Sequence, residues 1–295
     1  MKKILSIALA ALLLLGCVSS FASCQDQQKL TFGKEMLAVG SQLDALNGLL
    51  KGDADIAVID SVMAGYYMNS TDSFKDYQII DGVVLAEEQY GIAAKKGNDA
   101  LIGKINEAMI ALADTEYKNI ATTYGLATET LVTAATVNPN ANATDSSWTN
   151  IATEGKLIIG YTLFAPIAYT DGDGENAPLK GFDIDLAKAV VAYLNQKYST
   201  NVTVEFVKIE WSQKEALLEN GTIDLVWNGM TITDERVAAM SVSIPYLANK
   251  QVAITKKSEA ASYGKTKDEL IANAKDAIII VEKGSAGEEI VCPVE

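Results

Sequence analysis

Apolar and polar residues alternate along this 295-residue chain in short blocks of two kinds. Residues 202–207 alternate with period two and are rich in β-branched side chains, which predicts a strand. A preceding segment carries apolar residues at helical spacing, namely Phe182, Leu186, Ala189, Val190, Tyr193 and Leu194. Apolar runs at residues 56–59, 157–160, 223–227 and 278–281 predict buried strands. This alternation of strands and helices predicts an α/β fold.

One pattern occurs twice. A serine followed three residues later by an acidic residue predicts a helix start at Ser41 and again at Ser212. Gly52 and Gly221 end these two predicted helices, and a buried strand follows each of them. The repetition predicts two similar α/β lobes, although helix-glycine-strand units also recur by chance.

A third kind of segment interrupts the pattern. Residues 127–155 are rich in Ala, Thr, Asn and Ser, with little periodicity after Val132. This composition predicts a surface linker, assigned to residues 127–147.

The first 22 residues are typical of an export signal. Lys2 and Lys3 precede an apolar run at residues 4–15 that is too short to span a bilayer comfortably. Residues 14–17 resemble a lipobox, which would lipidate Cys17, whereas residues 20–22 suit ordinary signal peptidase. We expect an extracytoplasmic protein, either soluble or anchored as a lipoprotein.

Composition excludes several functions. The chain has 24 basic and 38 acidic residues and a net charge of -14, which argues against nucleic-acid binding. It contains no histidine, which excludes Ser-His-Asp and Cys-His catalysis and His-ligated metals. Residues 171–175 mimic part of a calcium loop without its distal glutamate, so we expect a hairpin turn and no metal or cofactor.

Residues 227–236 follow a predicted buried strand, where open α/β sheets bind ligands. They supply the Thr231 hydroxyl and Arg236, the only arginine in the chain. A guanidinium grips a carboxylate through two parallel hydrogen bonds, which lysine cannot do. We therefore predict that Arg236 binds a carboxylate. The alternative is a surface ion pair with Asp234 or Glu235.

Three more candidate sites follow predicted strands. Asp60 could bind a ligand ammonium or cap the next helix. Residues 285–287 could bind an anion through backbone N–H groups, or form a plain connection between a strand and a helix. Phe164 lies in an aromatic-rich loop that could cover a ligand, although such rings more often belong to the core.

These segments together resemble the family 3 extracellular solute-binding proteins, the amino-acid receptors of ABC importers. The matching stretches are residues 52–60, 90–97, 155–161, 180–187, 221–225, 229–236 and 244–246. The resemblance implies the type II periplasmic-binding-protein fold, with two α/β lobes joined by a two-crossing hinge. The crossings would lie near Gln89 and Lys257.

The order of the segments departs from the family and looks like a circular permutation. Lobe 1 would comprise residues 90–126 and 148–257, and lobe 2 residues 24–89 and 258–295. Cys24 and Cys292 would lie on either side of the new termini, where we hypothesise a disulfide. A tandem of two incomplete modules is the alternative.

The resemblance implies a role for each candidate residue. Arg236 would bind the ligand α-carboxylate, with Thr231, Asn228 and the Gly229 backbone beside it. Asp60 would bind the α-ammonium. Lobe 2 would donate N–H groups from Ser285, Ala286 and Gly287, and Phe164 would lie against the ligand side chain. Thr162 stands where the family often has an acidic residue, so the preferred amino acid is not predicted.

The implied function is capture of a free L-amino acid by a monomer and its delivery to the membrane subunits of an ABC permease. Hinge closure around the ligand would be the mechanism, without catalysis. A cyclohexadienyl-dehydratase-like enzyme on the same fold and a non-transport sensor are the alternatives.

Overall fold

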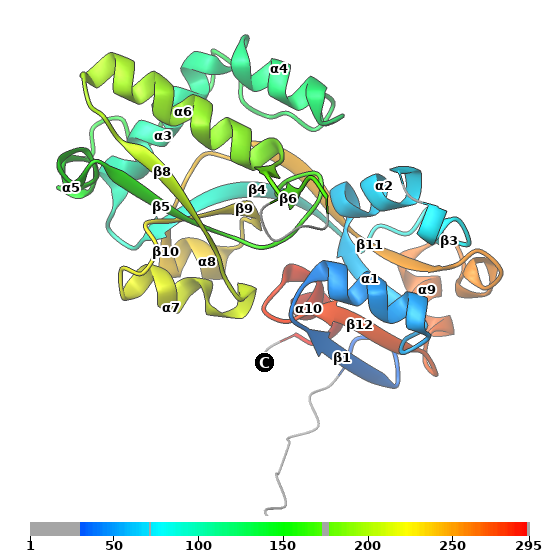
Figure 1. The fold of residues 1–295 in the computed structure, drawn as a ribbon. Coiled ribbons are helices and arrows are strands. Elements are labelled where there is room, and N and C mark those ends of the chain that lie inside the picture. Colours follow the sequence, from blue (N-terminus) through cyan, green and yellow to red (C-terminus); the bar gives the residue numbers. More distant parts are fainter. Residues whose placement is uncertain (1–29, 71, 173–176, 294–295) are drawn as a thin grey trace, which may run out of the picture.

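One mixed β-sheet continues through both halves of the molecule, and helices cover its faces (Figure 1). The computed structural model describes residues 30–293 except Thr71 and residues 173–176. The strand order is β1-β12-β2-β11-β4-β9-β5-β8, with β3 beside β11 and β10 beside β4. The strands are β1 (Glu35–Val39), β2 (Ile56–Asp60), β3 (Tyr77–Ile79), β4 (Ala86–Lys95), β5 (Lys156–Tyr161), β6 (Tyr169–Thr170), β7 (Leu179–Lys180), β8 (Thr203–Lys208), β9 (Leu225–Thr231), β10 (Met240–Val242), β11 (Leu247–Lys256) and β12 (Ile278–Glu282).

Helices divide between two lobes, as the sequence predicts (Figure 1). They are α1 (Gln42–Lys51), α2 (Ser61–Ser70), α3 (Asp99–Leu112), α4 (Glu116–Thr123), α5 (Ser147–Glu154), α6 (Phe182–Tyr198), α7 (Lys214–Glu219), α8 (Asp234–Ala239), α9 (Lys267–Asn273) and α10 (Ala286–Val291). In lobe 1, α3, α4 and α6 lie on one side of the sheet, and α7 and α8 on the other. In lobe 2, α1 and α2 lie opposite α9 and α10.

Burial on both faces explains the apolar runs. Ile56 and Val58 of β2 join the core cluster that contains α9 and α10, while Ala57 and Ile59 join the cluster that contains α1 and α2. A strand covered on both sides has no polar face, so its sequence is continuously hydrophobic.

Of the two helix starts that the repeated pattern predicts, the structure confirms the one at Ser41. The Ser41 side chain accepts the Asp44 N–H and caps α1, and Gly52 ends that helix at φ 82°. Ser212, in contrast, lies inside a 3-10 turn (Trp211–Gln213), and Gln213 precedes α7. The predicted cap at Ser212 is therefore wrong. The tight turn packs Trp211 into a buried cluster with Ile209 and Leu218.

Two antiparallel strands connect the lobes. β4 and β11 pair from Tyr90 opposite Leu247 to Ala86 opposite Gln251. From Gln251 onward β11 also pairs with β2 of lobe 2, before reaching Lys257. Any movement of one lobe relative to the other therefore has to bend or twist this pair of strands.

The segment between α4 and α5 lies against lobe 1. The Leu131 N–H donates to the Tyr246 carbonyl at 3.2 Å, and the Asn138 amide donates to the Gly103 carbonyl at 2.8 Å. Helix α5 begins at Ser147, the last residue of the predicted linker.

The first and last described strands are neighbours. β1 pairs in parallel with β12, and the Thr31 N–H donates to the Val291 carbonyl at 2.8 Å. The predicted export signal, Cys17 and Cys24 lie outside the described residues. Cys292 is buried and forms no disulfide with another described residue. Within the described ranges no helix is both long and apolar enough to cross a bilayer.

Candidate functional site

The predicted ligand groups meet where the two lobes face each other. β2 and β12 bring Asp60 and Glu282 from lobe 2, while β9 and α8 bring Thr231 and Arg236 from lobe 1. They surround a cavity of about 10 Å³ whose complete lining is Gln42, Asp60, Thr162, Phe164, Trp211, Asn228, Gly229, Thr231, Arg236, Glu282, Ser285 and Ala286. This is room for about one water molecule. The lobes are therefore closed around this cavity.

Eight of the nine predicted ligand residues line this cavity, and Gly287 does not. Gly287 lies in the first turn of α10, packed against β2 and β11. A Cβ there would lie 3.1 Å from the Val58 carbonyl oxygen and 3.2 Å from Gln251 Oε1. Glycine at this position allows α10 to approach the sheet closely.

Arg236 is buried and bonded to both lobes. Its Nη1 donates to the Thr231 carbonyl at 2.9 Å, and its Nη2 donates to Glu289 Oε1 at 2.8 Å and to the Gly284 carbonyl at 3.3 Å. Neither Asp234 nor Glu235 is its ion-pair partner, so the surface ion pair considered from the sequence is wrong. The guanidinium instead holds a carboxylate from α10 of the opposite lobe.

Asp60 is the centre of a buried polar cluster. Its carboxylate accepts hydrogen bonds from Tyr90 and Gln251, both at 2.9 Å, and from the amides of Gln42 and Asn249. Burial, reinforced by the nearby Glu88 charge, raises the pKa of Asp60 to about 7. These donors come from α1 and the two crossing strands, so the position of Asp60 is tied to the hinge.

Glu88 is a hinge residue that the sequence reasoning missed. Its Oε2 accepts from Thr231 at 3.0 Å, from Asn249 at 2.9 Å and from Gln251 at 3.1 Å. Burial raises the pKa of Glu88. The sequence offers only a weak signal for this network, since Asn249 and Gln251 alternate along β11, a strand that also contains Lys250 and Thr255.

Glu282 and Lys214 add a second charged layer from opposite lobes. Glu282 is 4% exposed, and its Oε1 has no hydrogen-bond partner among the described residues. Burial and the Asp60 charge raise the pKa of Glu282 to about 8. Lys214 donates to the Gly284 carbonyl at 3.1 Å, and burial and the Arg236 charge lower its pKa to about 8. Lys214 was missed because it lies in a predicted helix start, and Glu282 because it ends an apolar run that predicts only a buried strand.

Lobe 1 shapes the cavity through one glycine. Gly229 has φ 62°, and a Cβ there would lie 2.7 Å from the Phe164 ring, so only glycine permits this contact. The Gly229 N–H donates to Asp183 at 2.8 Å, and Tyr246 donates to the same carboxylate oxygen at 2.7 Å. The Asn228 amide bonds to the Thr162 hydroxyl at 2.8 Å. The buried Asp183 carboxylate therefore fixes the backbone at Gly229 from the side facing away from the cavity.

Ser285 organises the lobe 2 side. Its side chain caps α10 by accepting the Glu288 N–H at 3.2 Å, while its own N–H donates to the Glu282 carbonyl at 3.2 Å. The turn thus presents the start of α10 to the cavity.

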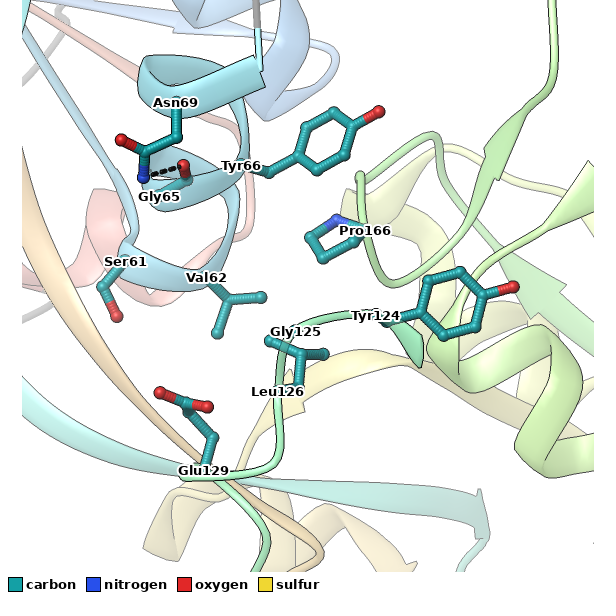
Figure 2. A pocket seen from close by; sticks show the side chains of 10 residues that line it. All are labelled: Ser61, Val62, Gly65, Tyr66, Asn69, Tyr124, Gly125, Leu126, Glu129 and Pro166. Carbon is teal, nitrogen blue, oxygen red and sulfur yellow. Dashed lines mark hydrogen bonds between the residues drawn. The ribbon is translucent and has the colours of Figure 1, made fainter. Parts of the chain in front are cut away.

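A second, wider cavity of about 310 Å³ also lies between the lobes (Figure 2). It is bounded by α2, by residues 124–126 and by Pro166, and Glu129 is the charged residue in its lining. The Glu129 side chain points toward Ser61 and Val62 at the start of α2 (Figure 2). None of the predicted ligand residues lines this space.

Two α/β lobes on paired crossing strands, with charged side chains from both lobes around one cavity, are the arrangement expected of a type II periplasmic-binding protein. Residues 157–289 match the model of the bacterial extracellular solute-binding proteins, family 3. The match covers a little under half of the chain and confirms the resemblance to that family. Among the described residues no cluster of metal-ligating side chains occurs.

Individual relatives match over similar lengths. The probable histidine-binding protein of Neisseria gonorrhoeae is 34% identical over 38% of this chain and 39% of that protein. L-cystine-binding protein TcyJ of Escherichia coli (strain K12) is 30% identical over 39% and 40%. A histidine-bound ABC uptake transporter substrate binding protein from Streptococcus pneumoniae is 36% identical over 32% of this chain and 35% of that chain, with a TM-score of 0.27. The chain thus spans about two fifths of the length of the curated relatives it matches.

Proposed function

We propose that this protein captures an L-amino acid outside the cytoplasmic membrane and delivers it to an ABC importer. The observation that carries the proposal is that Arg236 of lobe 1 and Asp60 of lobe 2 line the same cavity. Their opposite charges suit the α-carboxylate and α-ammonium of one small zwitterion. The family match and the amino-acid ligands in the names of the relatives support it.

Binding would proceed from an open state. The cavity of about 10 Å³ does not admit an amino acid, so the lobes have to move apart about the β4–β11 pair. The ligand would then bridge Arg236 and Asp60 and favour reclosure, because it contacts both lobes only when they are closed. The closed form is what an importer would receive.

We also infer that the chain order is a circular permutation of the family fold. The first and last described strands are adjacent, and together the segments complete both lobes once. A tandem of incomplete modules would instead leave each lobe in need of a partner.

Calorimetric titration with the common L-amino acids tests the proposed function. We expect at least one to bind the wild type, and Arg236→Ala to lose at least about 2 kcal/mol of binding free energy, the scale for truncating one side of a buried charged pair. Lys188→Ala, on the exposed side of α6, serves as the control and keeps the wild-type affinity. Failure of every amino acid to bind, or unchanged affinity in Arg236→Ala, would contradict the proposal.

A further inference from the structure

The cavity between the lobes has an unbalanced set of charges. Its charged lining consists of two carboxylates, Asp60 and Glu282, and one guanidinium, Arg236. A neutral amino acid would satisfy Arg236 with its carboxylate and Asp60 with its ammonium, leaving Glu282 unmatched. On the basis of the proposed function, we propose that the ligand is an L-amino acid with a cationic side chain and that Glu282 binds this cation.

One carboxylate oxygen of Glu282 lacks a donor, although the neighbouring Gln42 side chain interacts with the same carboxyl group. Glu282 is 4% exposed, and its Oε1 is buried with no hydrogen-bond partner among the described residues. A buried acceptor left unpaired destabilises the protein, and the cost is greater for a charged group. A guanidinium, ammonium or imidazolium on the ligand would provide the missing donor.

Lys214, a buried basic residue, does not donate to the Glu282 carboxylate. Lys214 is not part of the cavity lining, and its ammonium donates to the Gly284 carbonyl at 3.1 Å. It lies beyond 4.0 Å from the Glu282 carboxylate, since its ion-pair contact within that limit is with Glu215. Glu282 therefore lines the cavity and keeps one oxygen without a partner among the described residues.

The remaining lining suits the same ligand class. The ring of Phe164 borders the cavity, and aromatic faces attract cations. The Trp211 ring already has a cation of the protein over it, the Lys214 ammonium at 5.0 Å from the ring centroid. Thr162 stands in the first loop of lobe 1, where the family resemblance leads us to expect an acid, and it bonds to Asn228. The carboxylate for the ligand side chain thus comes from β12 of lobe 2.

Titration with L-arginine and L-citrulline tests this assignment, because citrulline replaces the guanidinium by a neutral group of similar shape. We expect the wild type to prefer arginine by about 30-fold or more, on the scale for a buried charged pair. Glu282→Gln should reduce arginine affinity to the level of citrulline and leave citrulline binding within a few-fold. Thermal melts verify that the variant is folded.

Glu129→Gln is the matched control, because it removes a carboxylate from the neighbouring cavity and should preserve the preference for arginine. The assignment is overturned if Glu282→Gln keeps the preference, if Glu129→Gln abolishes it, or if the wild type binds citrulline as well as arginine. Binding of neutral amino acids alone would overturn this inference and leave the proposed function intact. Absence of binding by any amino acid would overturn both.

Discussion

Arg236 of lobe 1 and Glu289 of lobe 2 form an ion pair at 2.8 Å across the closed interface. The Arg236 side chain is 4% exposed, whereas that of Glu289 is 40% exposed. The guanidinium that we assign to the ligand α-carboxylate therefore already holds a carboxylate of the protein. Glu289 pairs with Arg236 across the interface, and it would compete with the proposed ligand for the same donor.

Removing this competitor should open the empty protein and strengthen ligand binding. We expect Glu289→Gln to increase the distance between the lobes without ligand, because the inter-lobe ion pair is lost. Small-angle scattering would show a larger radius of gyration, and calorimetry a severalfold tighter Kd. Glu235→Gln is the control, since Glu235 lies exposed on the same helix as Arg236. An unchanged radius of gyration together with weaker binding would show that Glu289 supports the ligand site instead.

A buried aspartate behind the cavity should make stability depend on pH. Burial raises the pKa of Asp183 from 3.8 to about 7. Below pH 4 the folded and unfolded states both hold this proton. As pH rises to 7 the unfolded state ionises first, so this residue progressively destabilises the fold, by about 4 kcal/mol once the pH exceeds 7.

Asp183→Asn removes that titration. Relative to the wild type, the variant should gain up to about 4 kcal/mol of unfolding free energy between pH 4 and pH 7.5. Urea denaturation at several pH values measures this slope, and a constant offset from altered hydrogen bonds does not affect it. Asp53→Asn, at an exposed position, should show the same pH dependence of the unfolding free energy as the wild type. A flat difference for Asp183→Asn would mean that the carboxyl is ionised when folded.

Much of the fold follows from the sequence, because strands buried on both faces leave continuous apolar runs and caps such as Ser41 leave a local signature. Asp60 and Arg236 could be found because each follows such a run. Glu88 and Asn249 could not, since their contact depends on the register between two strands more than 150 residues apart. The closed pairing of Arg236 with Glu289 depends on how the lobes meet, which no local pattern encodes.

Ligand affinity should also depend on pH. Burial raises the pKa of Asp60 to about 7 and that of Glu282 to about 8, so both hold protons in part of the neutral range. A cationic amino acid requires both carboxylates ionised, and its affinity should rise from pH 6 to 8. The Glu88 charge raises the pKa of Asp60, and the Asp44 charge raises the pKa of Glu282. The Lys214 charge lowers the pKa of Glu282.

Calorimetry with L-arginine at pH 6, 7 and 8 measures this dependence. Glu282→Gln should show a smaller rise, because one of the two titrations is gone. An affinity that falls with pH in the wild type would contradict the protonation states assigned to the pair.

The first and last described segments are adjacent, which predicts that the segments of the chain can be reordered. Joining residue 293 to residue 30 by a short Gly/Ser linker should be tolerated, because the Thr31 N–H already bonds to the Val291 carbonyl at 2.8 Å. New ends between Thr136 and Val137 would fall in the segment that joins α4 to α5, where Val137 is 80% exposed. We expect a folded monomer with a Tm within a few degrees of the wild type, since no core contact is lost. The same join with new ends after Ile158, inside β5, should fail to fold. A reordered chain that folds only as a dimer would favour tandem incomplete modules over a permutation.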